Sequence, residues 1–222
     1  MDFKINYHII QAAHTIKESD LLYYDSQVLP WRKNRTPYRI FLAEFLLVRT
    51  RTDVMPRVFE DVVSVYPDIN KLADTSEEEL AIVLKPLGLK KRVPILIRAA
   101  HYILKEHNGL IPGTISDLLR IPGLGLYTAV AIAAFAFEAV DVPADVNILR
   151  FLSRFTGLEM THPTKGSEEL RELLPFLSKV HSGLSPEKLL DFSRLVCRSR
   201  RPKCPDCPLQ SGCRYFSDLG SQ

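Results

Sequence analysis

Four cysteines lie close together near the end of the sequence, in the pattern Cys197-x6-Cys204-x2-Cys207-x5-Cys213. Because one short segment contains all four, a single loop can bring four thiolates around one metal centre. Thiolates held together repel one another unless a cation lies between them, and sulfur ligands suit both zinc and iron–sulfur clusters. The spacing predicts a structural metal centre and leaves these two kinds of metal open.

A second pattern is the short glycine motif Ile121-Pro122-Gly123-Leu124-Gly125, which lies between two apolar segments. We expect one helix to end near Arg120 and the next to run from about Thr128 to Phe137. Two glycines permit positive φ angles and leave backbone N–H groups uncovered at the start of the second helix. Such donors suit a DNA phosphate. A plain helix–helix turn is the alternative interpretation of the same motif.

Asp145 directly precedes the amphipathic segment Val146–Phe151, so it is expected to cap the N-terminus of a helix. The helix dipole and the backbone N–H groups would keep its carboxylate ionised. An ionised carboxylate can stabilise a cationic, sugar-like transition state, which makes Asp145 a candidate catalytic residue. A purely structural cap is the alternative.

Glu44 is a second candidate, because it lies on or beside an apolar helical stripe that includes Ile40, Phe41 and Phe45. The helix is expected to open at Thr36-Pro37. Burial of a carboxylate favours its protonated form and suits general acid or base work, although an ion pair with Arg39 or Arg49 would also explain the residue. Two carboxylates in different surroundings are typical of enzymes that cleave glycosidic bonds.

The elements that must position these residues are predicted to be helices. Apolar residues recur with helical periodicity, alternating strand-like runs are nearly absent, and prolines separate the segments. The sequence therefore predicts an all-α protein. With 222 residues and 46% hydrophobic residues it can bury one large core or two smaller ones.

The formal net charge of +3 is too small to indicate a nucleic-acid partner by itself. Basic residues nevertheless gather at Arg49–Arg51, Lys90–Arg92 and Arg198–Lys203, where a phosphate backbone could bind. The first residues show no apolar signal segment, and the longest apolar run, Ala129–Phe137, is too short for a membrane span. A cytoplasmic protein without a membrane partner is therefore expected, in a compartment where cysteines bind metal more often than they form disulfides.

Together, the hairpin Ile121–Gly125, Asp145 and the four-cysteine pattern resemble the endonuclease III superfamily of DNA glycosylases over about residues 28–216. The resemblance implies a helix-hairpin-helix DNA glycosylase fold with two helical domains and a cleft between them. Residues 28–138 would form a six-helix barrel domain, and residues 1–27 with 139–222 the second domain. It also implies a [4Fe–4S] cluster on the four cysteines.

Within this superfamily the glutamate at position 44 is similar to that of the adenine glycosylases and the thymine–DNA mismatch glycosylases. Tyr127 stands where strand-cleaving members place a lysine, and tyrosine cannot form an imine, so base removal without strand cleavage is implied. The run Leu47-Val48-Arg49-Thr50 looks more like the thymine enzymes. The expected substrate is thymine or uracil opposite guanine, with adenine opposite 8-oxoguanine or guanine as the alternative.

The resemblance further implies contacts with double-stranded DNA that contains a mispaired or damaged base, bound by a monomer. The flipped base would enter a pocket lined by Tyr127, with Asp145 stabilising the sugar. Leu89 resembles a wedge that enters the duplex, and Val48 or Arg49 would fill the vacated space. The remaining expected DNA-binding residues are Gly123, Gly125 and Lys90.

Two further hypotheses remain at this point. A glycosylase with lyase activity would act on oxidised pyrimidines through a lysine elsewhere in the chain. A non-catalytic DNA-binding protein would keep the same fold and use Asp145 only as a helix cap.

Overall fold

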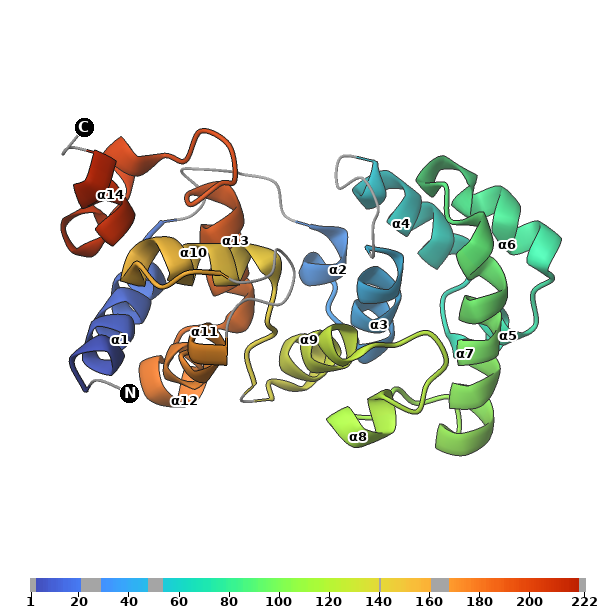
Figure 1. The fold of residues 1–222 in the computed structure, drawn as a ribbon. Helices are drawn as coiled ribbons and strands as arrows, with labels where there is room; N and C mark the ends of the chain where they lie inside the picture. Colours follow the sequence, from blue (N-terminus) through green and yellow to red (C-terminus); the bar gives the residue numbers. More distant parts are fainter. Residues whose placement is uncertain (1–2, 21–28, 48–53, 140, 161–167, 220–222) are drawn as a thin grey trace. The chain divides into compact units, whose positions relative to one another are not determined.

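The structure is a computed structural model that describes residues 3–20, 29–47, 54–139, 141–160 and 168–219. Within these ranges every regular element is a helix and no strand occurs, which confirms the predicted all-α class (Figure 1). No helix of the described residues is both long and apolar enough to span a lipid bilayer.

The chain divides into two compact units, which we describe separately. The hairpin unit is Val28–Ala139, and the cysteine unit combines Met1–Gln27 with Val140–Gln222. The sequence-based division was residues 28–138 and residues 1–27 with 139–222. The first unit is one continuous piece of chain, whereas the second is assembled from both ends of the sequence.

Several helices of the hairpin unit begin with a polar N-cap residue. Thr36 accepts a hydrogen bond from the Arg39 N–H ahead of Pro37, as the sequence predicted, and Ser76 and Glu79 form a capping box. Its elements are α2 (Pro30–Lys33), α3 (Pro37–Leu46), α4 (Met55–Val65), α5 (Ile69–Ala73), α6 (Glu77–Leu84), η2 (Lys85–Leu87), η3 (Lys90–Arg92), α7 (Val93–His107), α8 (Ile115–Leu118) and α9 (Leu126–Phe137).

The core of the hairpin unit is built around α3, whose residues Ile40–Leu46 are all buried. Helix α9 packs against α3, and α5 packs against α7. The apolar residues of α9 are also largely buried, which explains why its sequence is apolar on nearly every side. The two helices that carry Glu44 and Tyr127 therefore belong to one packed core.

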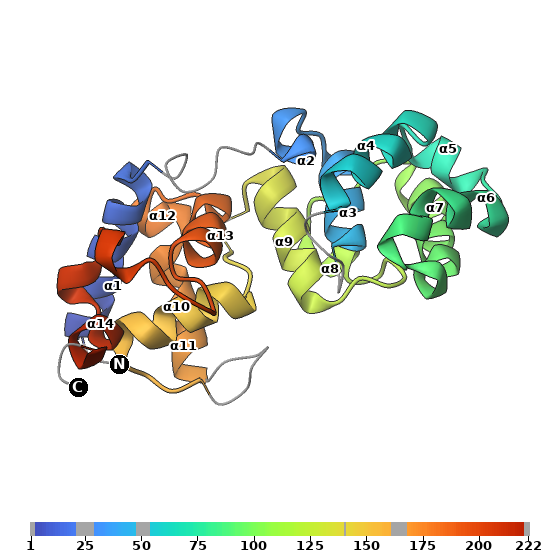
Figure 2. The ribbon, with the colours of Figure 1, turned by 90° about the horizontal axis from the view of Figure 1, so that it is seen from above.

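The cysteine unit joins the first helix of the chain to the last ones. Figure 2 shows α1 beside α13, and the two are in contact. Apolar residues of α1, such as Ile9 and Ile16, share a core with Phe151 of α10 and Phe192 of α13. The elements are α1 (Phe3–Glu18), α10 (Val146–Thr156), α11 (Glu168–Glu172), η4 (Leu174–Leu177), α12 (Lys179–Ser182), α13 (Pro186–Leu195), η5 (Cys204–Asp206), η6 (Gln210–Gly212) and α14 (Arg214–Leu219).

Candidate active site and cysteine pocket

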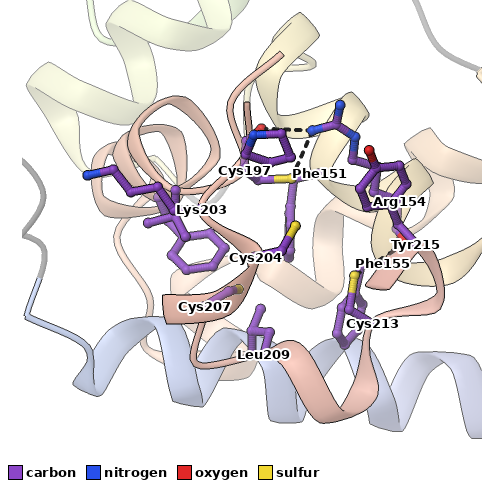
Figure 3. A pocket seen from close by; sticks show the side chains of 13 residues that line it. Phe151, Arg154, Phe155, Cys197, Lys203, Cys204, Cys207, Leu209, Cys213 and Tyr215 are labelled. Carbon is purple, nitrogen blue, oxygen red and sulfur yellow. Dashed lines mark hydrogen bonds between the residues drawn. The ribbon is translucent and has the colours of Figure 1, made fainter. Parts of the chain in front are cut away.

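The four cysteines line one pocket of the cysteine unit, and all are half-buried free thiols (Figure 3). The space between its walls, part of it open to solvent, is about 360 Å³. The rest of the lining is mostly apolar and comes from α10, α13 and the C-terminal loops. One loop thus gathers the four sulfur atoms, as their spacing predicted.

The pocket favours protonated thiols in the absence of a cation. Burial raises the pKa of Cys207 to about 11, and it also raises the pKa of Cys204 and Cys213. Negative charge on the neighbouring cysteines adds to each rise in pKa, while backbone N–H groups of Leu209 and Phe216 oppose it at Cys207 and Cys213. Deprotonating these thiols together therefore requires a positive charge in the pocket.

Arg154 on α10 is a cation beside this pocket, and it fixes the loop that follows Cys197. Its Nη1 donates to the carbonyl oxygen of Arg198 at 2.7 Å, and its Nη2 donates to that of Ser199 at 3.2 Å. Nη1 also lies 3.7 Å from the Cys197 sulfur, and the guanidinium lies 4.7 Å from the centre of the Tyr215 ring (Figure 3). The basic loop predicted to meet DNA is thereby tied to a helix.

An all-sulfur donor set fits zinc or iron–sulfur chemistry. Among the described side chains, no three cysteine, histidine or acidic groups stand together closely enough to hold one metal ion. The four cysteines instead surround a space.

The glycine motif forms a tight hairpin between α8 and α9. Gly123 has a φ of +85°, and a Cβ added there would lie 2.4 Å from Cγ2 of Ile95, so only glycine fits without rearrangement. Nothing lies within 4 Å of a Cβ at Gly125, which directly precedes α9. The flanking helices stop at Leu118 and begin at Leu126, two residues away from the predicted ends.

Asp145 caps α10, as predicted. Its Oδ1 accepts hydrogen bonds from the backbone N–H of Asn147 at 2.6 Å and from the Asn147 side-chain amide at 2.7 Å. The residue is partly exposed. The cap therefore leaves a carboxylate that is oriented by hydrogen bonds and still reachable from solvent.

Glu44 lies in the middle of α3 and is only 8% exposed. Of the two arginines considered as its partners, Arg39 forms an ion pair with Glu60 at 2.8 Å, and Arg49 lies outside the described residues. Tyr127, in the first turn of α9, is 37% exposed. Glu44 and Tyr127 belong to the hairpin unit, whereas Asp145 belongs to the cysteine unit.

The expected duplex wedge does not project from the hairpin unit. Leu89 is 8% exposed, although Lys90 beside it is exposed. Gly88 turns the chain with a φ of +68°, and burying the Leu89 side chain removes apolar surface from water. Val48, the other expected DNA contact besides Arg49, also lies outside the described residues.

The sequence and the fold both match those of known proteins. A model of the HhH-GPD superfamily of base excision DNA repair proteins matches residues 42–176, which is more than half of the chain. The chain belongs to the HhH-GPD superfamily. It is thus a base-excision DNA glycosylase, a hydrolase of N-glycosyl bonds.

Individual HhH-GPD relatives align with most of the chain. A thymine-DNA glycosylase of Aeropyrum pernix is 31% identical over 88% of this chain and 90% of the relative. An adenine DNA glycosylase of Buchnera aphidicola is 26% identical over 86% of this chain but only 55% of the relative. A solved structure of a thermostable thymine-DNA glycosylase superposes with a TM-score of 0.83 at 26% identity, covering 97% of this chain and 98% of that one.

Sequence reasoning did not find three polar residues that surround the HhH-GPD candidate site. Asn147, Arg150 and Arg154 lie on α10, and their side chains hydrogen-bond to Asp145, to each other or to the cysteine segment. Their spacing of three and four residues places Asn147, Arg150 and Arg154 on one helical face, and this was the available signal. The residues that accept their hydrogen bonds could not be read from that spacing.

Proposed function

We propose that this glycosylase removes thymine or uracil paired with guanine, and that it does so without cutting the DNA strand. The proposal is carried by one observation, the oriented and accessible carboxylate of Asp145 at the start of α10. The 31% identity to a thymine-DNA glycosylase supports this choice of substrate.

In this proposal Asp145 stabilises the positive charge that develops on the deoxyribose as the N-glycosyl bond breaks. Glu44, being buried, positions the attacking water or assists the departing base. Thymine and uracil leave as anions, so hydrogen bonds to their oxygens stabilise the departing group. Tyr127 lines the base pocket and, having no amine, forms no imine with the sugar.

DNA contacts are proposed for both units. Backbone N–H groups at Gly123 and Gly125 bind a phosphate at the start of α9, and Lys90 adds a positive charge. The loop held by Arg154 brings further basic side chains to the phosphate backbone of the DNA. Leu89 can enter the duplex only if it leaves its buried position, which makes a change of the Gly88-Leu89 turn part of this proposal.

A [4Fe–4S] cluster is the proposed group in the cysteine pocket, held by Cys197, Cys204, Cys207 and Cys213. When bound, it supplies positive charge to the thiolates and a rigid centre for the loop. The all-sulfur donor set formed by the four cysteines of one pocket supports this proposal. Arg154 would hold the Cys197 thiolate from outside the cluster.

The test is a cleavage assay on duplexes with one T·G, U·G, A·8-oxoguanine, A·G or thymine glycol site, with and without alkali. Cleavage at T·G and U·G that depends on alkali is expected, and Asp145→Asn should slow it about 10³-fold. Cleavage confined to adenine opposite 8-oxoguanine or guanine would assign the chain to the adenine enzymes. Cleavage at thymine glycol without alkali would indicate a lyase, and binding without any cleavage would contradict the proposal.

A further inference from the structure

A groove on the hairpin unit is lined by the end of α4, by α6 and by the segment between them. Helices α4 and α6 are in contact with each other (Figure 1). The groove encloses about 880 Å³, part of it open to solvent. Its apolar lining consists of Val65, Tyr66, Ile82 and Val83. None of the candidate site residues described above lines this groove, so it has no role in the proposed reaction.

Two of the apolar side chains in the groove are exposed to water. Ile82 is 72% exposed and Val65 is 52% exposed. Single exposed apolar residues are common on protein surfaces, but these two line one groove together with Val83. Apolar surface gathered in one hollow is typical of a site where another molecule binds.

Hydrogen bonds fix the polar side of the groove. The Thr75 hydroxyl donates to Oε2 of Glu79 at 3.2 Å, and the Tyr66 hydroxyl lies 3.0 Å from Oγ1 of Thr75. Oε2 of Glu79 also accepts from the backbone N–H of Ser76 at 3.1 Å. The hydrogen bonds from Ser76, and then the one from Thr75, hold the pKa of Glu79 below its usual range. A ligand would therefore meet a preformed wall that carries a negative charge.

The groove lies in an acidic part of the hairpin unit. Residues 55–84 contain seven acidic and two basic side chains, whereas the rest of the unit contains five acidic and thirteen basic ones. Asp74 and Glu79 line the groove and are exposed, and Lys71 is the one basic residue in its lining. Carboxylates repel DNA phosphates and attract positive charge. The charge of the groove therefore fits a basic protein segment and not a nucleic acid.

We propose that this groove binds a helical segment of another protein that has one apolar face and basic residues beside it. The apolar face would be buried against Val65 and Ile82, and the positive charges would face Asp74 and Glu79. An amphipathic helix in an apolar groove is a common mode of peptide recognition. The groove would bring a second protein to the glycosylase through a surface that repels DNA. This proposal does not depend on which base the enzyme removes.

The probe for this groove is a fluorescent peptide of about 15 residues, with leucines at helical spacing and lysines between them. It should bind the wild-type protein in fluorescence anisotropy, and its affinity should fall as salt is raised. Two analogues, one with serine in place of leucine and one with glutamate in place of lysine, should bind at least about tenfold more weakly. Equal binding of the three peptides, or binding of none, would overturn the proposal.

Substitutions in the groove should weaken binding of the basic peptide. Ile82→Ser should weaken it about tenfold, because an apolar contact is lost. Asp74→Asn should weaken it about threefold and reduce its dependence on salt. The matched controls are Leu110→Ser and Glu106→Gln, because Leu110 is 73% exposed and neither residue lines the groove. Both controls should bind the peptide like the wild type, and equal losses in controls and test variants would exclude the groove as the site.

Two further measurements separate the groove from other binding sites. Amide NMR shifts caused by the peptide should be largest at Val65, Lys71 and Ile82, and shifts centred on Gly125 would overturn the proposal. Sedimentation velocity without peptide should show a monomer. A dimer that Ile82→Ser dissociates would mean that a second copy of this chain occupies the groove, which would overturn the proposed partner. Base excision and melting temperature should be those of the wild type in every groove variant.

Discussion

The two units hold their functional residues in different ways. In the hairpin unit, packing against Ile95 fixes Gly123, and Glu44 lies inside a fully buried stretch of α3. In the cysteine unit, Asp145 and the loop after Cys197 are fixed by hydrogen bonds from Asn147 and Arg154. A packed residue is sensitive to substitutions that change its volume, whereas a hydrogen-bonded residue is sensitive to substitutions that remove its polar group. Substitutions should therefore affect the two units differently.

The largest effect is expected for Asp145→Asn. Excision should fall about 10³-fold, because the negative charge that stabilises the transition state is lost. The melting temperature should stay nearly unchanged, since asparagine is as good a helix cap as aspartate. Single-turnover assays and thermal melts on the same sample check both statements. A melting temperature that falls with the rate would show that Asp145 is primarily structural.

Glu44 should show the opposite relation between activity and stability. Glu44→Gln should slow excision about 10²-fold, the usual contribution of a general acid or base. Glu44→Leu should be equally slow and also less stable than the wild type, because leucine cannot make the interaction of the buried carboxyl group. Urea unfolding measures the difference. A leucine variant as stable as the wild type would mean that Glu44 does not support the core.

The two hairpin glycines provide a matched pair. Gly123→Ala should lower the free energy of unfolding by about 1–3 kcal/mol, because its φ is positive and the new Cβ would meet Ile95. Gly125→Ala should have almost no effect on stability, since its φ is −98° and its surroundings are open. Urea unfolding of both variants would contradict the packing argument if their losses were equal.

The smallest effect is expected at the surface of the cysteine unit. Arg198→Gln should weaken binding to undamaged duplex DNA only a few-fold and reduce the salt slope by about 1, as expected for one phosphate contact. Fluorescence anisotropy at several salt concentrations measures both. An unchanged slope would mean that Arg198 does not contact a DNA phosphate. It would not affect the role proposed for Asp145.

The local features of the fold could be predicted from sequence because each has a local cause. Thr36 with Pro37 and Asp145 before Val146 are helix starts whose capping bonds span only a few residues. The hairpin followed from its glycines in the same way. Helix ends were predicted less accurately, since α8 stops at Leu118 and a short turn covers the predicted end near Arg120.

Features that depend on distant residues were not predicted. Leu89 was expected to project, but its burial depends on tertiary contacts that its own loop sequence does not reveal. The anchoring of Arg150 was also invisible, because its acceptors at Ser193 and Cys197 lie 43 and 47 residues further along the chain. The candidate carboxylates could therefore be identified, whereas the residues that orient them could not.

The packing of α1 against α13 also constrains the order in which the protein can mature on the ribosome. The hairpin unit is continuous and can fold as soon as it emerges. Helix α1 precedes the hairpin unit in the chain but cannot pack until α13, which follows that unit, has also been made. The four-cysteine pocket is thus completed only after the whole hairpin unit has been made, so any group that the pocket holds would enter it after that point.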